Sequence, residues 1–200
     1  MKILGITGPT GAGKSLLCKH LTDLGVPCID ADEVYHSLLI PPSACLDEIR
    51  ASFGSNVFDH QGTLDRDALG KIVFSDPEKL STLNCAVLGH VLNEIRFIVS
   101  QYESKGFEMV AVDAPTLIES GFHKECSTVI SVIASKEHRL DRITHRDHIT
   151  NEKAALRVKA QKSDEFYISH SDLVITNDGD INKIMEAAKK IVAQTEEIPK

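Results

Sequence analysis

Three features are missing from this sequence of 200 residues, and each absence excludes a class of protein. The five cysteines are scattered and never form a CxxC pair, which argues against a zinc site and against a disulfide framework. No apolar stretch approaches the roughly 20 residues of a membrane-spanning helix. The N-terminus enters a strand-like run at once, without the basic and apolar segments of a signal peptide. We therefore expect a cytoplasmic protein that has reduced thiols and does not act at a membrane.

Positive charge is also scarce, and it is unevenly distributed. The chain has 22 Lys and Arg against 29 Asp and Glu, a net charge of −7, which makes it a poor general binder of nucleic acid or of anionic lipid. Residues 136–162 nevertheless hold eight basic and four acidic side chains, so this segment carries +4 and the rest of the chain −11. A positive field concentrated in one segment suits a small polyanionic ligand. Nothing in the sequence specifies an oligomeric state.

Five short, apolar runs predict five strands. They are Ile3–Thr7, Val26–Ile29, Met109–Val112, Thr128–Ala134 and Leu173–Thr176. None shows strict alternation of polar and apolar residues, so each is expected to be buried on both faces. Helical patterns lie between them, such as the leucine-rich segment that ends before Gly25. Strands that alternate with helices predict an α/β fold, a parallel five-stranded sheet flanked by helices.

Two helical segments interrupt this alternation. Residues 33–105 lie between the second and third predicted strands, and the basic residues 136–168 lie between the fourth and fifth. We expect both to be insertions on a core made of residues 1–32, 106–135 and 169–200. A helical insertion and a basic helical segment beside a sheet are candidates for a substrate-binding domain and a lid.

The stretch GPTGAGKS, from Gly8 to Ser15, matches the pattern G-x-x-x-x-G-K-[ST] of a phosphate-binding loop. It stands between a predicted strand and a predicted helix, which is the context that this motif requires. The glycines let backbone N–H groups point at phosphate oxygens, Lys14 can reach the β- and γ-phosphates, and the Ser15 hydroxyl can bind Mg²⁺. We therefore predict a nucleoside triphosphate site with Mg²⁺. Its candidate residues are Gly8, Gly11, Ala12, Gly13, Lys14, Ser15 and Leu16.

Three acidic residues follow predicted strands, at the edge where ligands collect in parallel sheets. Asp113 ends the third strand, where a P-loop protein keeps an acid near the metal and the substrate. Asp30 and Asp32 end the second strand and would face the same side if the strand persisted through them. One could accept a proton from an attacking hydroxyl and the other could bind Mg²⁺. In the alternative reading, Asp32 only caps the helix that begins at Glu33.

The basic segment contains RLDRITHR, which places Arg139, Arg142 and Arg146 three and four residues apart on one face of a helix. Guanidinium groups on one face suit closure over phosphates. A solvated charged face would be the more common explanation, but a neighbouring P-loop favours the lid. A signalling GTPase is disfavoured, because the sequence has DAPT where Asp-x-x-Gly is expected and lacks Asn-Lys-x-Asp.

Taken together, these motifs resemble the dephospho-coenzyme A kinase family. The similar segments run almost from end to end: GPTGAGKS, LGVPCIDADEV, FGSNVFDHQGTLDRDALGKIVF, DAPTLIESG, RLDRITHR, RVKAQ and SDLVITNDGD. The resemblance implies a P-loop kinase core, a helical domain for the coenzyme A moiety at 33–105 and a mobile lid at 136–168. It also implies transfer of the γ-phosphoryl group of ATP to the ribose 3′-hydroxyl of dephospho-coenzyme A, so the expected partners are these two small molecules.

The resemblance further implies roles for individual residues. Asp32 would be the base and Arg142 a catalytic lid residue beside Lys14. Asn177 would begin the loop beside the adenine of ATP. On the acceptor side the resemblance implies Asp65, Arg66 and His90 beside Asp32, and it places Ser15 on Mg²⁺. The strand-end argument adds Asp113 as a candidate near the substrate and Asp30 as a candidate metal ligand. Two purely structural alternatives remain open, namely that Asp65 only caps a helix and that His90 is only a packed histidine.

The chain departs from the family pattern at three positions, with Val91 after His90 in place of Pro, Thr116 in place of Leu, and Tyr167 in place of Lys. All three lie outside the phosphate loop and Asp32. Two other functions therefore stay in view: a P-loop kinase for a nucleoside or nucleotide acceptor, and a nucleotide-binding module without turnover.

Overall fold

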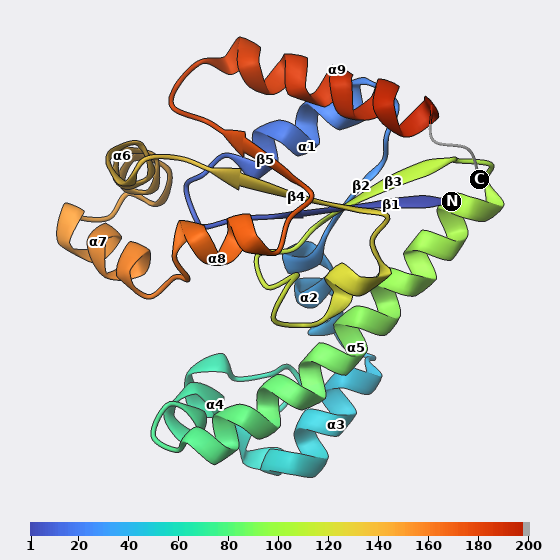
Figure 1. The fold of residues 1–200 in the computed structure, drawn as a ribbon. Coiled ribbons are helices and arrows are strands. Elements are labelled where there is room, and N and C mark those ends of the chain that lie inside the picture. Colours follow the sequence, from blue (N-terminus) through green and yellow to red (C-terminus); the bar gives the residue numbers. More distant parts are fainter. Residues whose placement is uncertain (198–200) are drawn as a thin grey trace. The chain divides into compact units, whose positions relative to one another are not determined.

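A computed structural model describes residues 1–197, which form a five-stranded parallel sheet with helices on both faces and a helical insertion (Figure 1). The strands are β1 Lys2–Thr7, β2 Cys28–Asp30, β3 Met109–Asp113, β4 Thr128–Ile133 and β5 Leu173–Thr176. Their order across the sheet is β2-β3-β1-β4-β5. Ile3 pairs with Val110 in β3, and Leu4 pairs with Thr128 in β4. The predicted α/β fold is confirmed.

The chain divides into two compact units, of which the first comprises Met1–Ile29 and Tyr102–Lys200. Its helices are α1 Lys14–Asp23, α6 Lys136–Asp147, α7 Asn151–Lys159, α8 Asp164–Ser169, α9 Ile181–Glu197 and the short η2 Phe122–Glu125. The basic segment 136–168 thus belongs to this unit. Helices α1 and α9 lie together over one face of the sheet (Figure 1). Leu17, Leu21 and Ile184 from these helices pack with Leu4 and Ile130 in the buried core.

The second unit comprises Asp30–Gln101, close to the insertion expected at 33–105. Its elements are α2 Ala31–Leu38, α3 Ala44–Phe53, η1 Ser55–Val57, α4 Arg66–Val73 and most of α5 Pro77–Ser104. It has a core of its own, which includes Leu46, Ile49, Val57 and Leu69. A separate core explains why the helical pattern of this segment interrupts the alternation of strands and helices.

The prediction that every strand is buried on both faces is wrong for β5. Strands β1, β3 and β4 have mostly buried residues, whereas Leu173 and Val174 in β5 are 36% and 41% exposed. Strand β5 lies at the edge of the sheet and pairs with β4, so it lacks a neighbour on its other side. A short apolar run does not distinguish a central strand from an edge strand.

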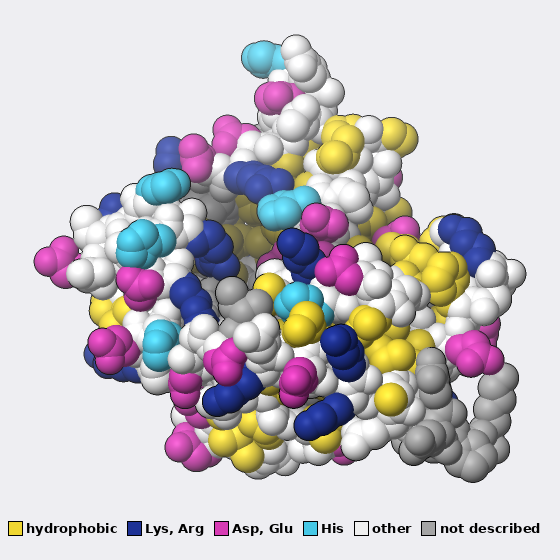
Figure 2. All heavy atoms as spheres, turned by 90° about the horizontal axis from the view of Figure 1, so that it is seen from above, with side chains coloured by type: hydrophobic (Ala, Val, Ile, Leu, Met, Phe, Trp, Pro, Cys, Tyr) yellow, Lys and Arg dark blue, Asp and Glu magenta, His cyan; other side chains and the backbone are white. Residues whose placement is uncertain are grey.

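One face of the protein is mixed in charge. On the face seen from the side of α9, Lys and Arg side chains are interspersed with Asp and Glu side chains (Figure 2). Among residues 1–197, the structure contains no helix that is both long and apolar enough to span a bilayer.

Candidate active site

The loop from Gly8 to Gly13 connects β1 to α1 and has the backbone shape of a phosphate-binding loop. Gly13 is the N-cap of α1, with φ of 105°, a conformation that residues other than glycine rarely adopt. A Cβ atom on Gly13 would lie 2.1 Å from Nδ2 of Asn177. No side chain caps α1, and the positive end of its dipole lies at this loop, where it favours an anion.

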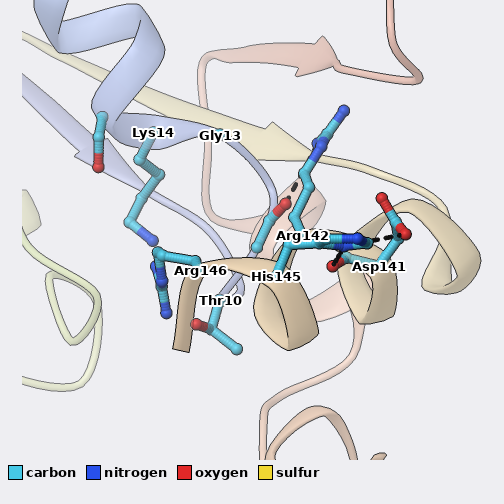
Figure 3. A pocket seen from close by; sticks show the side chains of 9 residues that line it. Thr10, Gly13, Lys14, Asp141, Arg142, His145 and Arg146 are labelled. Atoms are coloured by element: carbon cyan, nitrogen blue, oxygen red, sulfur yellow. Dashed lines mark hydrogen bonds and ion pairs between the residues drawn. The ribbon is translucent and has the colours of Figure 1, made fainter. Parts of the chain in front are cut away.

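A pocket of about 570 Å³ lies over this loop. The loop and α1 contribute one wall and α6 contributes the other; the lining residues are Thr10, Gly11, Gly13, Lys14, Ser15, Asp141, Arg142, His145 and Arg146. The side chains of Lys14 and Arg146 point toward the same part of the pocket (Figure 3). Two cations that converge on a glycine loop provide a suitable environment for phosphate groups. Lys14 Nζ also donates a hydrogen bond to the carbonyl oxygen of Gly8, at 3.0 Å.

Arg142 links the loop to the segment that follows β5. Its guanidinium donates to the carbonyl oxygens of Gly11 and Ala12, at 3.1 and 3.2 Å. It also donates to Asn177, at 2.9 Å to the carbonyl oxygen and 3.3 Å to Oδ1. The buried Asn177 donates from Nδ2 to the carbonyl oxygen of Ala12 at 2.8 Å. Arg142, Asn177 and the loop therefore form one hydrogen-bonded group that brings three distant predicted segments together.

Arg139 and Gln161 hold the loop at another point, Thr10. Arg139 Nε donates to the carbonyl oxygen of Thr10 at 3.1 Å, and Gln161 Oε1 accepts from the Thr10 N–H at 2.7 Å. Arg139 is only 5% exposed and forms an ion pair with Asp164 at 3.5 Å. Burial lowers the pKa of Arg139, while the charge of Asp164 opposes this shift. Arg139 thus supports the loop from within the fold rather than lying on a solvated helix face.

Arg146 differs from both of these arginines, because its side chain is 61% exposed and lines the pocket. Its Nε and one terminal nitrogen donate to the two oxygens of Asp147, at 2.7 and 3.1 Å. Arg157 from α7 binds the same carboxylate. The hydrogen bond from Arg146 is the main reason that the pKa of Asp147 lies below its ordinary value. Asp147 therefore joins the end of α6 to α7 and orients Arg146 beside the pocket.

Asp113 ends β3 as predicted and is buried. The Cys18 thiol, one turn beyond Lys14 in α1, donates to Asp113 Oδ2 at 3.6 Å. A hydrogen bond with the Cys28 thiol is the largest cause that raises the pKa of Cys18, followed by burial. The same bond lowers the pKa of Cys28. The carboxylate of Asp113 thus lies beside the helix that carries Lys14 and Ser15.

Asp30 and Asp32 belong to the second unit, and their local geometry differs from the prediction. The strand ends at Asp30 and does not persist through Asp32, so strand alternation does not place the two side chains on one side. Asp30, rather than Asp32, is the N-cap: its Oδ1 accepts from the N–H groups of Asp32 and Glu33, at 2.8 and 3.3 Å. Asp32 lies in the first turn of α2.

The predicted acceptor residues also lie in the second unit. Asp65 is the N-cap of α4 and accepts from the N–H groups of Asp67 and Ala68. Arg66 lies 3.4 Å from Nδ1 of His36. His90 is paired with Glu48 at 2.7 Å and lines a pocket of about 380 Å³ between α3 and α5. The structure does not bring Asp65 and His90 together by any direct contact among the described residues.

Sequence patterns missed several residues of the pocket and its supports. Thr10, Asp141 and His145 line the pocket, and Gln161 and Asp147 hold parts of it in place. His145 is three residues after Arg142, a helical spacing that could have placed it on the face that carries Arg142; Asp141, four residues before His145, is ion-paired with it at 3.2 Å. No sequence signal indicated the bond between Thr10 and Gln161, because it depends on the tertiary fold.

Comparison with known proteins concerns almost the whole chain and not only the loop. The family model of dephospho-CoA kinase matches residues 2–183. A dephospho-CoA kinase of Dehalococcoides mccartyi is 35% identical over 177 residues, which cover 88% of this chain and 89% of that protein. A crystal structure from Thermus thermophilus superposes with a TM-score of 0.81 at 30% identity, covering 96% of this chain and 97% of that one. Dephospho-CoA kinase from Campylobacter jejuni gives a TM-score of 0.71 at 25% identity, with 98% of both chains covered. The chain belongs to the dephospho-CoA kinase family.

Proposed function

We propose that the protein transfers the γ-phosphoryl group of ATP to the ribose 3′-hydroxyl of dephospho-CoA, forming coenzyme A and ADP. The observation that carries this proposal is the pocket over the glycine loop, in which Lys14 and Arg146 converge from opposite walls. A kinase needs little covalent chemistry from the protein, since positioning and neutralisation of the transferred phosphoryl group provide most of the rate enhancement. The proposed acceptor is inferred from the family, and the proposed binding of phosphate is inferred from the pocket.

In the proposed reaction, the acceptor oxygen bonds to the γ-phosphorus while the bond from that phosphorus to the β,γ-bridging oxygen breaks. The loop N–H groups and Lys14 hold the phosphates, and Arg142 and Arg146 of α6 balance the negative charge. Asp32 is proposed as the base that accepts the proton of the hydroxyl. Arg142 is proposed to act on the same phosphates from its place in the pocket wall, while its hydrogen bonds keep the loop in shape.

Mg²⁺ fits the residues at this site. Ser15 presents a hydroxyl beside Lys14 in the pocket, and Asp113 presents a carboxylate beside α1. Oxygen donors of this kind suit Mg²⁺, which typically takes only one or two ligands from the protein and the rest from phosphates and water. Bound there, the ion would neutralise charge on the β- and γ-phosphates. Asp30 remains a predicted metal ligand, with one carboxylate oxygen engaged in capping α2.

Other residues keep proposed roles. Asn177 is proposed to lie beside adenine, while Asp65, Arg66 and His90 are proposed to contact the acceptor within the second unit. Residues 136–168 are proposed to act as the lid. All five cysteines are free thiols, and we propose a cytoplasmic location on this basis.

The test is an ADP-release assay with ATP, Mg²⁺ and dephospho-CoA, followed by mass spectrometry of the product. The expected product is heavier than dephospho-CoA by one phosphoryl group and matches coenzyme A. Turnover with a nucleoside but not with dephospho-CoA would assign a different acceptor and overturn the proposal. Absence of ADP with every acceptor would favour a binding module without turnover.

A further inference from the structure

Two cysteines that the proposed reaction does not use lie together behind the phosphate-binding loop. Cys18 is in α1, one turn beyond Lys14, and Cys28 begins β2. Cys28 Sγ lies 3.3 Å from the carbonyl oxygen of Cys18 and 3.8 Å from that of Val26. The neighbouring Cys28 raises the pKa of the Cys18 thiol, and Cys18 lowers the pKa of the Cys28 thiol. Both residues belong to the first unit and are only partly buried.

This arrangement is suited to a disulfide. The chain between the two residues is a helical turn followed by a short loop, which reverses at Gly25 with φ of 87°. The reversal brings the beginning of β2 alongside the middle of α1, so the Cys28 sulfur lies against the backbone of Cys18. Cysteines this close can be bridged by a change of side-chain rotamer, whereas Cα atoms more than about 7 Å apart require backbone movement.

The other cysteines lack this combination. Cys85 is exposed and Cys45 is buried in the core of the second unit. Cys126 packs against Gly5 and donates to the carbonyl oxygen of Phe122. Cys18 and Cys28 are thus a partly accessible pair in which one sulfur lies against the backbone of the other residue.

We propose that Cys18 and Cys28 form a dithiol site that low-molecular-weight disulfides oxidise to an intramolecular disulfide, and that this oxidation lowers the kinase activity. The statement about activity rests on the proposed function, whereas the statement about the disulfide does not. In the reduced protein, the Cys18 thiol donates to Asp113 Oδ2. The Cys18–Cys28 disulfide has no thiol hydrogen to donate, so it removes this bond to the acid at the end of β3.

The reaction proceeds in two thiol–disulfide exchanges. In the first, the Cys28 sulfur bonds to one sulfur of the small disulfide, its S–S bond breaks, and the departing thiolate takes the proton that Cys28 releases. In the second, the Cys18 sulfur attacks the Cys28 sulfur of the mixed disulfide, and the second small thiol departs with the proton of Cys18. Two protein thiols are oxidised to one disulfide, while one small disulfide is reduced to two thiols.

The effect on activity follows from the position of Cys18. Lys14 and Ser15 occupy the turn of α1 immediately before it, and the proposed disulfide ties that helix to β2. A displacement of about 1 Å in groups that position a reacting phosphate can lower the rate on the order of 10²-fold. We expect the oxidised protein to lose at least about 80% of kcat, which is about a fivefold decrease and smaller than the 10²-fold effect of a full 1 Å displacement.

The experiment oxidises the full chain in mixtures of reduced and oxidised glutathione, then blocks remaining thiols and maps tryptic peptides without reduction. Cleavage after Lys19 separates Cys18 from Cys28, so their disulfide appears as two linked peptides. The peptide with Cys28 also contains Cys45, and fragmentation of the linked species tells these two cysteines apart. The expected species links Cys18 to Cys28, and dithiothreitol is expected to remove it and restore kcat.

Three variants sharpen the test. Oxidised glutathione is expected to leave the kcat of Cys28→Ser and of Cys18→Ser unchanged, whatever its starting value. The matched control Cys85→Ser is expected to lose activity on oxidation as the unsubstituted protein does. Linkage of Cys18 to Cys45, glutathione retained on Cys28, or no linked peptide at any ratio would overturn the dithiol site. A complete Cys18–Cys28 disulfide with unchanged kcat would overturn the effect on activity. If dephospho-CoA is not the acceptor, the peptide map still decides the first statement.

Discussion

Replacing Arg142 by alanine tests whether this residue shapes the loop, acts on the phosphates, or does both. One terminal nitrogen of Arg142 is shared between the carbonyl oxygens of Gly11 and Ala12, and the other is shared between two oxygens of Asn177. We count these as two effective charged donors, each contributing about 1.5 kcal/mol, so the loss is about 3 kcal/mol. For a chain of this size, the melting temperature should then fall by about 6–12 °C.

The assay pairs thermal unfolding with steady-state kinetics. Arg146→Ala is the matched control for the unfolding measurement. Arg146 is 61% exposed and paired with Asp147, so its loss should change stability by at most about 1 kcal/mol. Arg142→Ala is also expected to lower kcat by ~10² or more if this arginine balances charge in the transition state. A melting temperature unchanged by Arg142→Ala would refute the structural reasoning. An unchanged kcat in the folded variant would remove Arg142 from the catalytic group.

Three further predictions concern single positions. Gly13→Ala should destabilise the protein by at least about 2 kcal/mol in thermal unfolding, because φ of 105° opposes any Cβ; measured against Asn177→Ala alone, the same change should cost less, by the part due to the 2.1 Å contact. Asp32→Asn should lower kcat by about 10² or more while leaving the melting temperature within a few degrees; unchanged turnover would remove Asp32 from the role of base. The pKa of Asp147 is lowered chiefly by Arg146, so its pairing stabilises the fold above the ordinary pKa of an aspartate and is lost as pH falls through the lower folded value. The gap in melting temperature between the unsubstituted protein and Asp147→Asn should therefore be constant near neutral pH and shrink in acid, and a gap independent of pH would contradict this.

The fold could be predicted from the sequence to a large extent, for a physical reason. Short apolar runs form buried strands because helices cover the side chains on both faces of the sheet. The loop motif fixes where the first strand ends and the first helix begins. The edge position of β5 was missed, since Leu173 and Val174 read like core residues. The end of β2 was predicted to within one residue, but the strand does not persist through Asp32, because Asp30 caps α2 in a local competition between two conformations.

The loop residues of the candidate site could be predicted because the motif encodes a backbone shape, and Gly13 and Lys14 have the conformation and place that it requires. The supports of the loop could not be predicted. Gln161 accepts from Thr10 across 151 positions of the chain, and no local pattern specifies such a partner. The residues alone left open whether Asp30 or Asp32 is the base, and the resemblance selected Asp32 and assigned His90 to the acceptor; both roles stay predictions.

The three arginines of α6 show why spacing alone cannot assign roles. Arg139, Arg142 and Arg146 lie along one helical face, yet each side chain contacts a different part of the protein. Arg139 is buried against Thr10, Arg142 meets two loop carbonyls and Asn177, and Arg146 reaches the open pocket. The first two arginines thus cross-link the loop to elements that the chain reaches more than a hundred residues later. The proposed binding of phosphate and the support of the loop therefore involve the same helix, so a substitution in α6 has to be judged by kinetics and unfolding together.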